Sequence, residues 1–189
     1  MALATIPTTL PGPLLLEPRV FPDERGFFCE TYREADLAEH GVNDHFVQDN
    51  HSRSDRGVLR GLHFAIGAGS SKLVRCGRGV VVDVIVDLRR GSPAYGRWEA
   101  HELSDANMRV LYVPVGFAHG FCVTSDVADV LYKQSAYYDP QVERAITWDD
   151  PQIGVEWPLP REEVSVSERD AQAPALEQVA AELPFVFAG

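Results

Sequence analysis

The chain has 189 residues, 45% of them hydrophobic and 24% charged, and this balance predicts one soluble globular domain over residues 1–189. A formal net charge of −11 argues against general binding to nucleic acid or to anionic membranes. No apolar run in the sequence reaches the roughly 18 residues that span a bilayer. The first residues resemble no secretion signal, so a cytoplasmic location is expected.

The first helix signal is the sequence from Thr31 to Glu34, which matches a capping box, with Gly41 as the stop of a short helix. Cys29, Cys76 and Cys122 are odd in number and form no C-x-x-C pair. Reduced thiols are therefore expected.

The segment Arg60-Gly61-Leu62-His63 reads as a strand. Strict alternation places Arg60, Leu62 and Phe64 on one face, and Gly61 and His63 on the other. A glycine beside a histidine leaves room for a ligand to approach the imidazole ring.

β-branched runs separated by short turns dominate the middle of the chain. They predict an all-β fold, an antiparallel sandwich or barrel, with strands at Lys72–Cys76, Val80–Leu88, Val110–Pro114 and Val127–Gln134.

Helix is predicted sparingly near the C-terminus. Residues 149–160 hold three prolines and are expected to wrap the outside of the sheet. A helical stretch is expected from Ala173 to Leu183, weakened by Pro174. Ser167 could cap a helical turn, with Asp170 reaching back to it.

Taken singly, the candidate functional residues have ordinary structural readings. His63 could be a core histidine, Lys72 a solvated strand end and Tyr132 a packing residue with a satisfied hydroxyl. His63 and His119 have no histidine close to them in sequence, so no metal site is expected. The glycine-rich segments lack the patterns of nucleotide-binding loops.

Taken in order, the motifs resemble those of the dTDP-4-dehydrorhamnose 3,5-epimerase family over nearly all of residues 19–174. The matching segments are Asp23–Phe28, Phe46–Asn50, Gly57–His63, Lys72–Val74, Asp83–Arg89, Pro114–Phe121, Tyr132, Tyr137-Tyr138, Trp157–Leu159 and Ser167–Asp170.

The resemblance implies a cupin-like jelly-roll β-sandwich with a few short peripheral helices, used without a metal or other cofactor. It implies a homodimer whose N-terminal strands exchange between subunits. The implied substrate is dTDP-4-dehydro-6-deoxy-D-glucose, converted to dTDP-4-dehydro-L-rhamnose on the route to dTDP-L-rhamnose.

The same resemblance assigns the catalytic roles. His63 would be the base that takes the protons at C3 and C5, and Asp170 would hold its imidazole. Tyr132 would be the acid on the opposite face. Lys72 would stabilise the charge that forms on the C4 oxygen.

Binding roles also carry over from the resemblance. Guanidinium groups suit a diphosphate, and Phe28 or Tyr138 could stack on thymine. The implied substrate-binding residues are Arg25, Phe28, Glu30, Gln48, Asp49, Asn50, Arg60, Lys72, His119, Tyr138, Glu143 and Arg169.

Two alternatives stay open. One is an enzyme that inverts a single centre, or moves the keto group, in another dTDP-deoxysugar pathway. The other is a catalytically silent nucleotide-sugar-binding jelly roll. Retention of His63, Lys72, Tyr132 and Asp170 together disfavours the silent protein, because binding alone requires neither a base nor an acid.

Overall fold

The computed structural model describes residues 3–188, and antiparallel strands dominate them. One sheet has six strands in the order β1-β2-β10-β7-β12-β5. Their bounds are β1 Leu3–Ile6, β2 Leu14–Pro18, β5 Gln48–Asp55, β7 Lys72–Arg78, β10 Val110–Val113 and β12 Val127–Gln134. Three of the four strands predicted for the middle of the chain are therefore confirmed, and β8 Val80–Asp87 of the second sheet confirms the fourth, with ends that differ by two residues or fewer.

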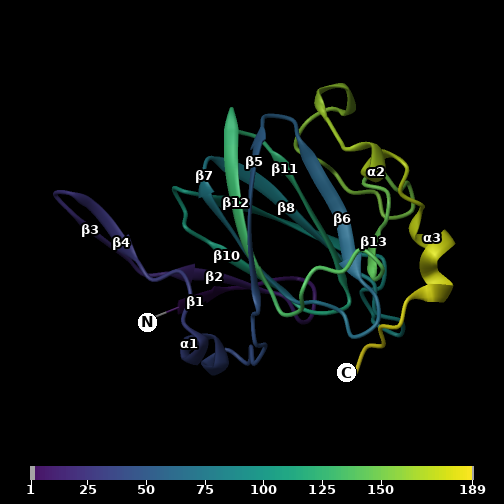
Figure 1. Cartoon of the computed structure of the whole chain (residues 1–189), viewed down its shortest axis with the longest axis horizontal. Coiled ribbons are helices and arrows are strands. Elements are labelled where there is room, and N and C mark those ends of the chain that lie inside the picture. The colour runs from purple at the N-terminus through teal and green to yellow at the C-terminus, as the bar shows by residue number, and fades with distance from the viewer. Residues whose placement is uncertain (1–2, 189) are drawn as a thin grey trace.

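A second sheet in the described chain has five strands in the order β13-β6-β11-β8-β9 and faces the first (Figure 1). Its strands are β6 Leu59–Ala65, β8 Val80–Asp87, β9 Trp98–Ser104, β11 Phe117–Val123 and β13 Glu143–Ala145. The main core fills the space between the two sheets, with Val74 and Val130 from one and Ile85 and Phe121 from the other. The predicted all-β, cupin-like sandwich is confirmed.

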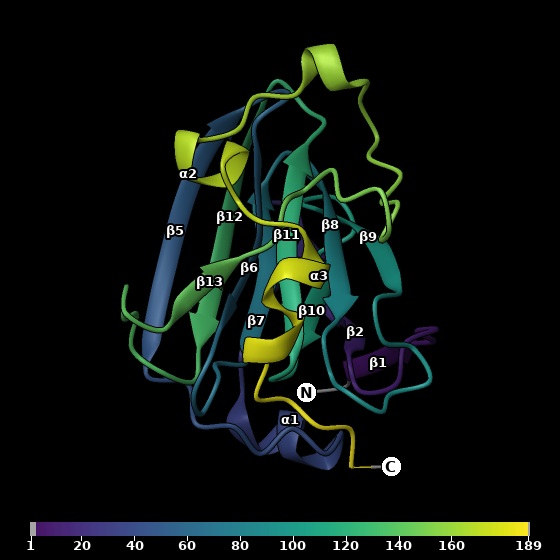
Figure 2. The same ribbon diagram turned by 90° about the vertical axis from the view of Figure 1, so that its right-hand side faces the viewer.

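The short helical segments lie outside the two sheets. They are α1 Glu34–Glu39, η1 Arg161–Glu163, α2 Glu168–Ala171, α3 Leu176–Val179 and η2 Ala180–Glu182. The C-terminal segment with α3 covers the outer face of the five-stranded sheet (Figure 2), where Leu176 and Leu183 pack against Val84 and Val86. The helix predicted over residues 173–183 is thus shorter and divided. Trp157 packs against the same outer cluster, as expected for residues 149–160.

The capping box predicted at Thr31 is wrong. The chain is still extended at Arg33, so α1 begins at Glu34, and no side chain caps it. Gly41 does end the helix: it has a φ of +83°, and its N–H donates to the Ala38 carbonyl.

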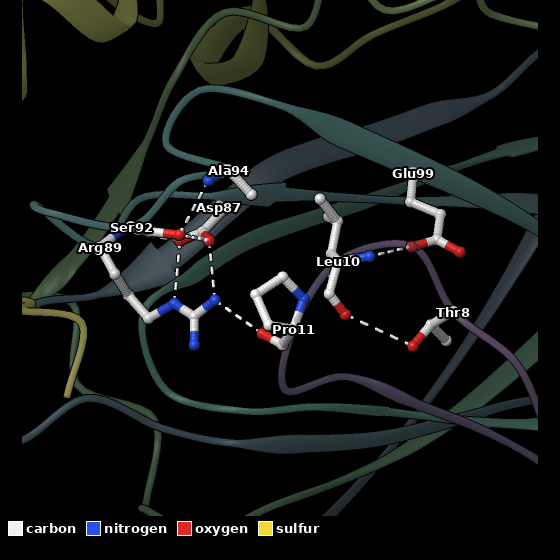
Figure 3. Close-up of polar contacts among 8 residues, drawn as sticks. All are labelled: Thr8, Leu10, Pro11, Asp87, Arg89, Ser92, Ala94 and Glu99. Atoms are coloured by element: carbon white, nitrogen blue, oxygen red, sulfur yellow. Dashed lines mark hydrogen bonds and ion pairs between the residues drawn. The ribbon is translucent and has the colours of Figure 1, made fainter. Parts of the chain in front are cut away.

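The loop between β1 and β2 is tied to the five-stranded sheet at two points (Figure 3). The Arg89 guanidinium donates to both carboxylate oxygens of Asp87 and, over 2.7 Å, to the Pro11 carbonyl. Nearby, the Leu10 N–H donates to Glu99 over 2.9 Å. These bonds connect the loop between β1 and β2 of the six-stranded sheet to residues of the five-stranded sheet.

A hairpin of β3 Val20–Asp23 and β4 Gly26–Cys29 projects from the body of the sandwich (Figure 1). It presents large apolar side chains to solvent, with Phe27 60% and Phe28 65% exposed. Among the described residues, no helix is both long and apolar enough to cross a membrane.

Candidate active site

A cavity of about 470 Å³ opens between the two sheets. It contains many of the expected site residues: Arg60, His63, Lys72, His119, Tyr132, Arg169 and Asp170. The six-stranded sheet contributes Lys72 from β7 and Tyr132 from β12, whereas His63 and His119 come from β6 and β11 of the other sheet. The imidazoles and the phenol therefore meet one cavity from opposite walls.

A β-bulge in β6 changes which residues face this cavity. His63 pairs with His119 and Arg60 pairs with Phe121, so two residues of β6 oppose the single residue Gly120 of β11. The extra residue breaks the alternation of side chains. The prediction that Arg60 and His63 lie on opposite faces is therefore wrong, because both line the cavity while Leu62 packs on the outer side.

His63 is held by a carboxylate from outside the sheets. Its Nε2 lies 2.7 Å from Oδ1 of Asp170, which is only 3% exposed. Burial acts to raise the pKa of Asp170, but hydrogen bonds, first that with His63, outweigh it and lower the pKa. An ionised Asp170 keeps the proton on Nε2, and this leaves Nδ1 of His63 with the lone pair.

The turn that carries Asp170 begins as predicted, but its carboxylate does not reach back. The Ser167 hydroxyl accepts a hydrogen bond from the Asp170 N–H and so caps α2. Oδ2 of Asp170 accepts a bond from the Gly61 N–H in the bulge, over 3.4 Å. The capping serine thus leaves the carboxylate free to orient His63.

Lys72 is an ammonium group in a buried position, 8% exposed. Burial lowers its pKa, while the carboxylates of Glu143 and Asp83 act in the opposite direction. Among residues 3–188, no carboxylate lies close enough to Lys72 to form an ion pair, so its charge stays available to the cavity.

Tyr132 and His119 complete the walls. Burial, with the nearby Glu143 carboxylate, raises the pKa of Tyr132, so the phenol stays protonated at neutral pH. Burial lowers the pKa of His119, whose Nε2 lies 2.9 Å from Oδ2 of the fully buried Asp83. No motif marked Asp83 as a site residue, although a carboxylate inside the apolar run Val80–Leu88 signals a buried polar partner.

Other expected binding residues lie beside the cavity rather than in its walls. Gln48 and Asn50 point inward from β5 and bond to Gln134, a residue that no motif signalled. Tyr138 is joined to this group because its N–H donates to Gln48. Glu143 begins β13, close enough to influence both Lys72 and Tyr132.

The remaining residues that were expected to bind substrate lie away from the cavity. Asp49 lies on the outward side of β5 and pairs with Lys133. Arg25 sits at the turn of the β3–β4 hairpin, paired with Asp23, and Phe28 lies on the same hairpin. Glu30 directly follows the hairpin.

Metal binding has no structural support in the described part of the chain. Within residues 3–188, no group of three or more histidine, cysteine, aspartate or glutamate side chains is arranged to hold a metal ion. The expectation of a reaction without cofactors stays a prediction.

The chain matches known proteins over most of its length. Residues 7–178 match the family model of dTDP-4-dehydrorhamnose 3,5-epimerase. The chain is 50% identical over 169 residues to the dTDP-4-dehydrorhamnose 3,5-epimerase of Pseudomonas aeruginosa, covering 88% of this chain and 92% of that one.

Solved structures agree with the sequence match. The structure of dTDP-6-deoxy-D-glucose-3,5-epimerase from Legionella pneumophila, in complex with dTDP-4-keto-L-rhamnose, has a TM-score of 0.95 and 43% identity, with all of both chains covered. A 3′-monoepimerase from Streptomyces bikiniensis, in complex with dTDP-quinovose, has a TM-score of 0.86 and 32% identity, covering 93% of this chain and 89% of that one.

Proposed function

The chain belongs to the dTDP-4-dehydrorhamnose 3,5-epimerase family and is an isomerase, and from this premise we propose that it inverts C3 and C5 of dTDP-4-dehydro-6-deoxy-D-glucose to give dTDP-4-dehydro-L-rhamnose. The observation that carries the mechanism is the placement of His63 and Tyr132 on opposite walls of one cavity, with Lys72 beside them. Inversion requires a proton to leave one face of a carbon and another to arrive on the other face.

The reaction proceeds by proton transfer alone. Nδ1 of His63 takes the proton from the carbon beside the C4 ketone, and the electron pair of that C–H bond moves to the C4 oxygen as an enolate. The Lys72 ammonium stabilises this negative charge, a type of contribution typically worth about 3–4 kcal/mol in a dry site. The Tyr132 hydroxyl then returns a proton from the opposite face. The imidazolium of His63 releases its proton to solvent, and the phenolate of Tyr132 takes one from solvent, so both groups return to their starting states.

The binding residues support a nucleotide sugar. Arg60 and Arg169 line the cavity and can pair with diphosphate oxygens. Tyr138, 52% exposed, offers a ring on which thymine can stack, at the end of the hydrogen-bonded group formed by Gln48 and Asn50.

A homodimer explains the residues that lie far from the cavity. Arg25 and Phe28, both expected to bind substrate, sit on the projecting hairpin, where Phe27 and Phe28 are 60% and 65% exposed within the described chain. In the proposed dimer the hairpin of one subunit reaches the cavity of its partner, so that each site takes residues from both chains.

Incubation with dTDP-4-dehydro-6-deoxy-D-glucose in heavy water tests the proposal. Deuterium at both C3 and C5, with the L-configured product, supports double epimerisation. Deuterium at one centre would instead assign a single-centre epimerase, the alternative favoured by the likeness to the Streptomyces bikiniensis 3′-monoepimerase. A relocated keto group would assign a keto-isomerase, and no deuterium would assign a binding protein.

A further inference from the structure

Three carboxamide side chains form a hydrogen-bonded chain beside the cavity. The Tyr138 N–H donates to Oε1 of Gln48 over 2.9 Å, and Nε2 of Gln48 donates to Oδ1 of Asn50 over 2.9 Å. Nδ2 of Asn50 then donates to Oε1 of Gln134 over 2.8 Å. Nε2 of Gln48 also lies 3.5 Å from the same Gln134 oxygen.

The direction of this chain is set at its first member. A backbone N–H can only donate, so Gln48 must turn its oxygen toward Tyr138 and its NH₂ group toward Asn50. Asn50 accepts from Gln48 with its oxygen and donates to Gln134 with its NH₂ group. The Gln134 oxygen therefore accepts, and the Gln134 NH₂ group is the last donor of the chain. The directions of these hydrogen bonds therefore determine the orientation of the Gln134 carboxamide.

The last donor belongs to a buried residue that lies opposite Lys72 on the neighbouring strand. Gln134 is 6% exposed, and its Nε2 has no hydrogen-bond acceptor among residues 3–188. Gln134 and Lys72 are Cα partners across β12 and β7, so their side chains project from the same face of the sheet. Tyr132, two residues earlier on that face of β12, lines the cavity together with Lys72.

The Lys72 ammonium and the Gln134 amide are neighbouring donors that together can bind one oxygen atom of a ligand. The Lys72 ammonium, like the Gln134 amide, has no hydrogen-bond acceptor within the described chain. An oxygen atom bound between the two groups would accept a hydrogen bond from each of them.

We propose that Gln134 is a substrate-orienting residue, whose Nε2 donates to the same sugar oxygen that Lys72 holds. This inference rests on the proposed function, in which that oxygen is the C4 keto group. The ammonium is a rotatable point charge, whereas the amide donor has a fixed direction. The hydrogen-bonded chain of carboxamides begins at the Tyr138 N–H. The donor at the sugar is therefore aligned by the loop that carries Tyr138, on whose ring the thymine is expected to stack.

The replacement Gln134→Glu tests the donor without dismantling the chain. A carboxylate still accepts from Asn50 but has no N–H to give. We expect kcat/KM to fall about 100-fold, the lower end of the loss for one preorganised donor to an oxyanion. The affinity for dTDP should stay within about twofold, because in the proposed binding mode the Gln134 amide contacts the sugar, which dTDP lacks.

Two further variants guard the interpretation. Gln141→Glu makes the same change of charge at an exposed glutamine and should leave kcat/KM unchanged. Asn50→Asp cannot donate to Gln134, so the Gln134 amide must turn and give its N–H to the new carboxylate. In Asn50→Asp, kcat/KM should fall although Gln134 is unchanged. This variant replaces Gln134→Glu as the test if Gln134→Glu does not fold.

A folded Gln134→Glu protein with kcat/KM within about twofold of wild type would overturn the inference. If the wild-type protein itself leaves the substrate unchanged, the proposed function fails, and calorimetric binding decides the role of Gln134. The extra affinity for the 4-keto nucleotide sugar over dTDP should then disappear in Gln134→Glu. Retention of that extra affinity would refute the donor role independently of turnover.

Discussion

At the scale of single residues, the proposed mechanism depends on the burial and the hydrogen-bond partners of four polar groups: His63, Lys72, Tyr132 and Asp170. The carboxylate of Asp170 fixes the tautomer of His63, and burial keeps the phenol of Tyr132 protonated. In the proposed mechanism, Lys72 supplies the positive charge that stabilises the enolate. The lowered pKa of Asp170 and the raised pKa of Tyr132 favour the ionised carboxylate and the protonated phenol that the proposed proton transfer uses.

Replacing His63 by alanine should abolish deuterium uptake from heavy water, because a positioned base contributes roughly 100- to 10,000-fold. Binding of dTDP, followed by calorimetry, should be nearly unchanged. His45→Ala removes an exposed histidine and serves as the matched control. Exchange at the wild-type rate in His63→Ala would show that another group is the base.

The decrease in activity at alkaline pH should result from deprotonation of Lys72. Burial lowers its pKa below the ordinary 10.5, so its charge is lost at lower pH, whereas burial raises the pKa of Tyr132 above 10.0. Activity that needs the ammonium therefore falls as pH rises through the lowered Lys72 value. In Tyr132→Phe, deuterium exchange should keep the same alkaline limb, and its disappearance in that variant would assign the limb to the phenol.

At the scale of elements, the bulge in β6 decides where the base and Arg60 point. Gly61 lies in it with a φ of +145°, and a Cβ atom added there would come within 2.5 Å of the Gly120 Cα. Only glycine permits this approach of β6 to β11. The bulge also places the Gly61 N–H against Asp170, so the same irregularity orients His63 and its carboxylate partner.

Gly61→Ala should therefore reduce stability by about 1–3 kcal/mol, the usual cost of overpacking, and lower kcat/KM by displacing His63. Urea unfolding and steady-state kinetics measure the two effects. Gly67→Ala is the control: its φ is +74° but no atom lies within 4 Å of the added Cβ. It should show only backbone strain with normal activity. Wild-type kcat/KM in Gly61→Ala would mean that the bulge does not position the base.

At the scale of the whole molecule, the hairpin of β3 and β4 is the part that a single chain leaves unexplained. It carries exposed phenylalanines and two expected substrate-binding residues away from the cavity (Figure 1). A large exposed apolar surface typically marks an interface. In the proposed exchange of hairpins between two subunits, the phenylalanines are buried against the partner, and the expected substrate-binding residues reach the partner's cavity.

Phe27→Ser should weaken the dimer measured by sedimentation. Each dimer would bury two such rings, each worth about 1.5–3 kcal/mol, so the dissociation constant should rise about 100-fold or more. Tyr95→Ser removes an exposed aromatic ring elsewhere and should leave association unchanged. A wild-type protein that sediments as a monomer at micromolar concentration would refute the dimer.

The amino-acid sequence by itself determined the all-β class, the central strands and the family, because β-branched runs and short motifs are local signals. His63, Lys72, Tyr132 and Asp170 could all be named from those motifs. Only the tertiary structure decided that Arg60 shares the cavity with His63, that Asp83 pairs with His119, and that Gln134 ends a directed chain of amides. These relations depend on a one-residue change of register and on contacts between strands far apart in the chain, and neither leaves a periodic trace in the sequence.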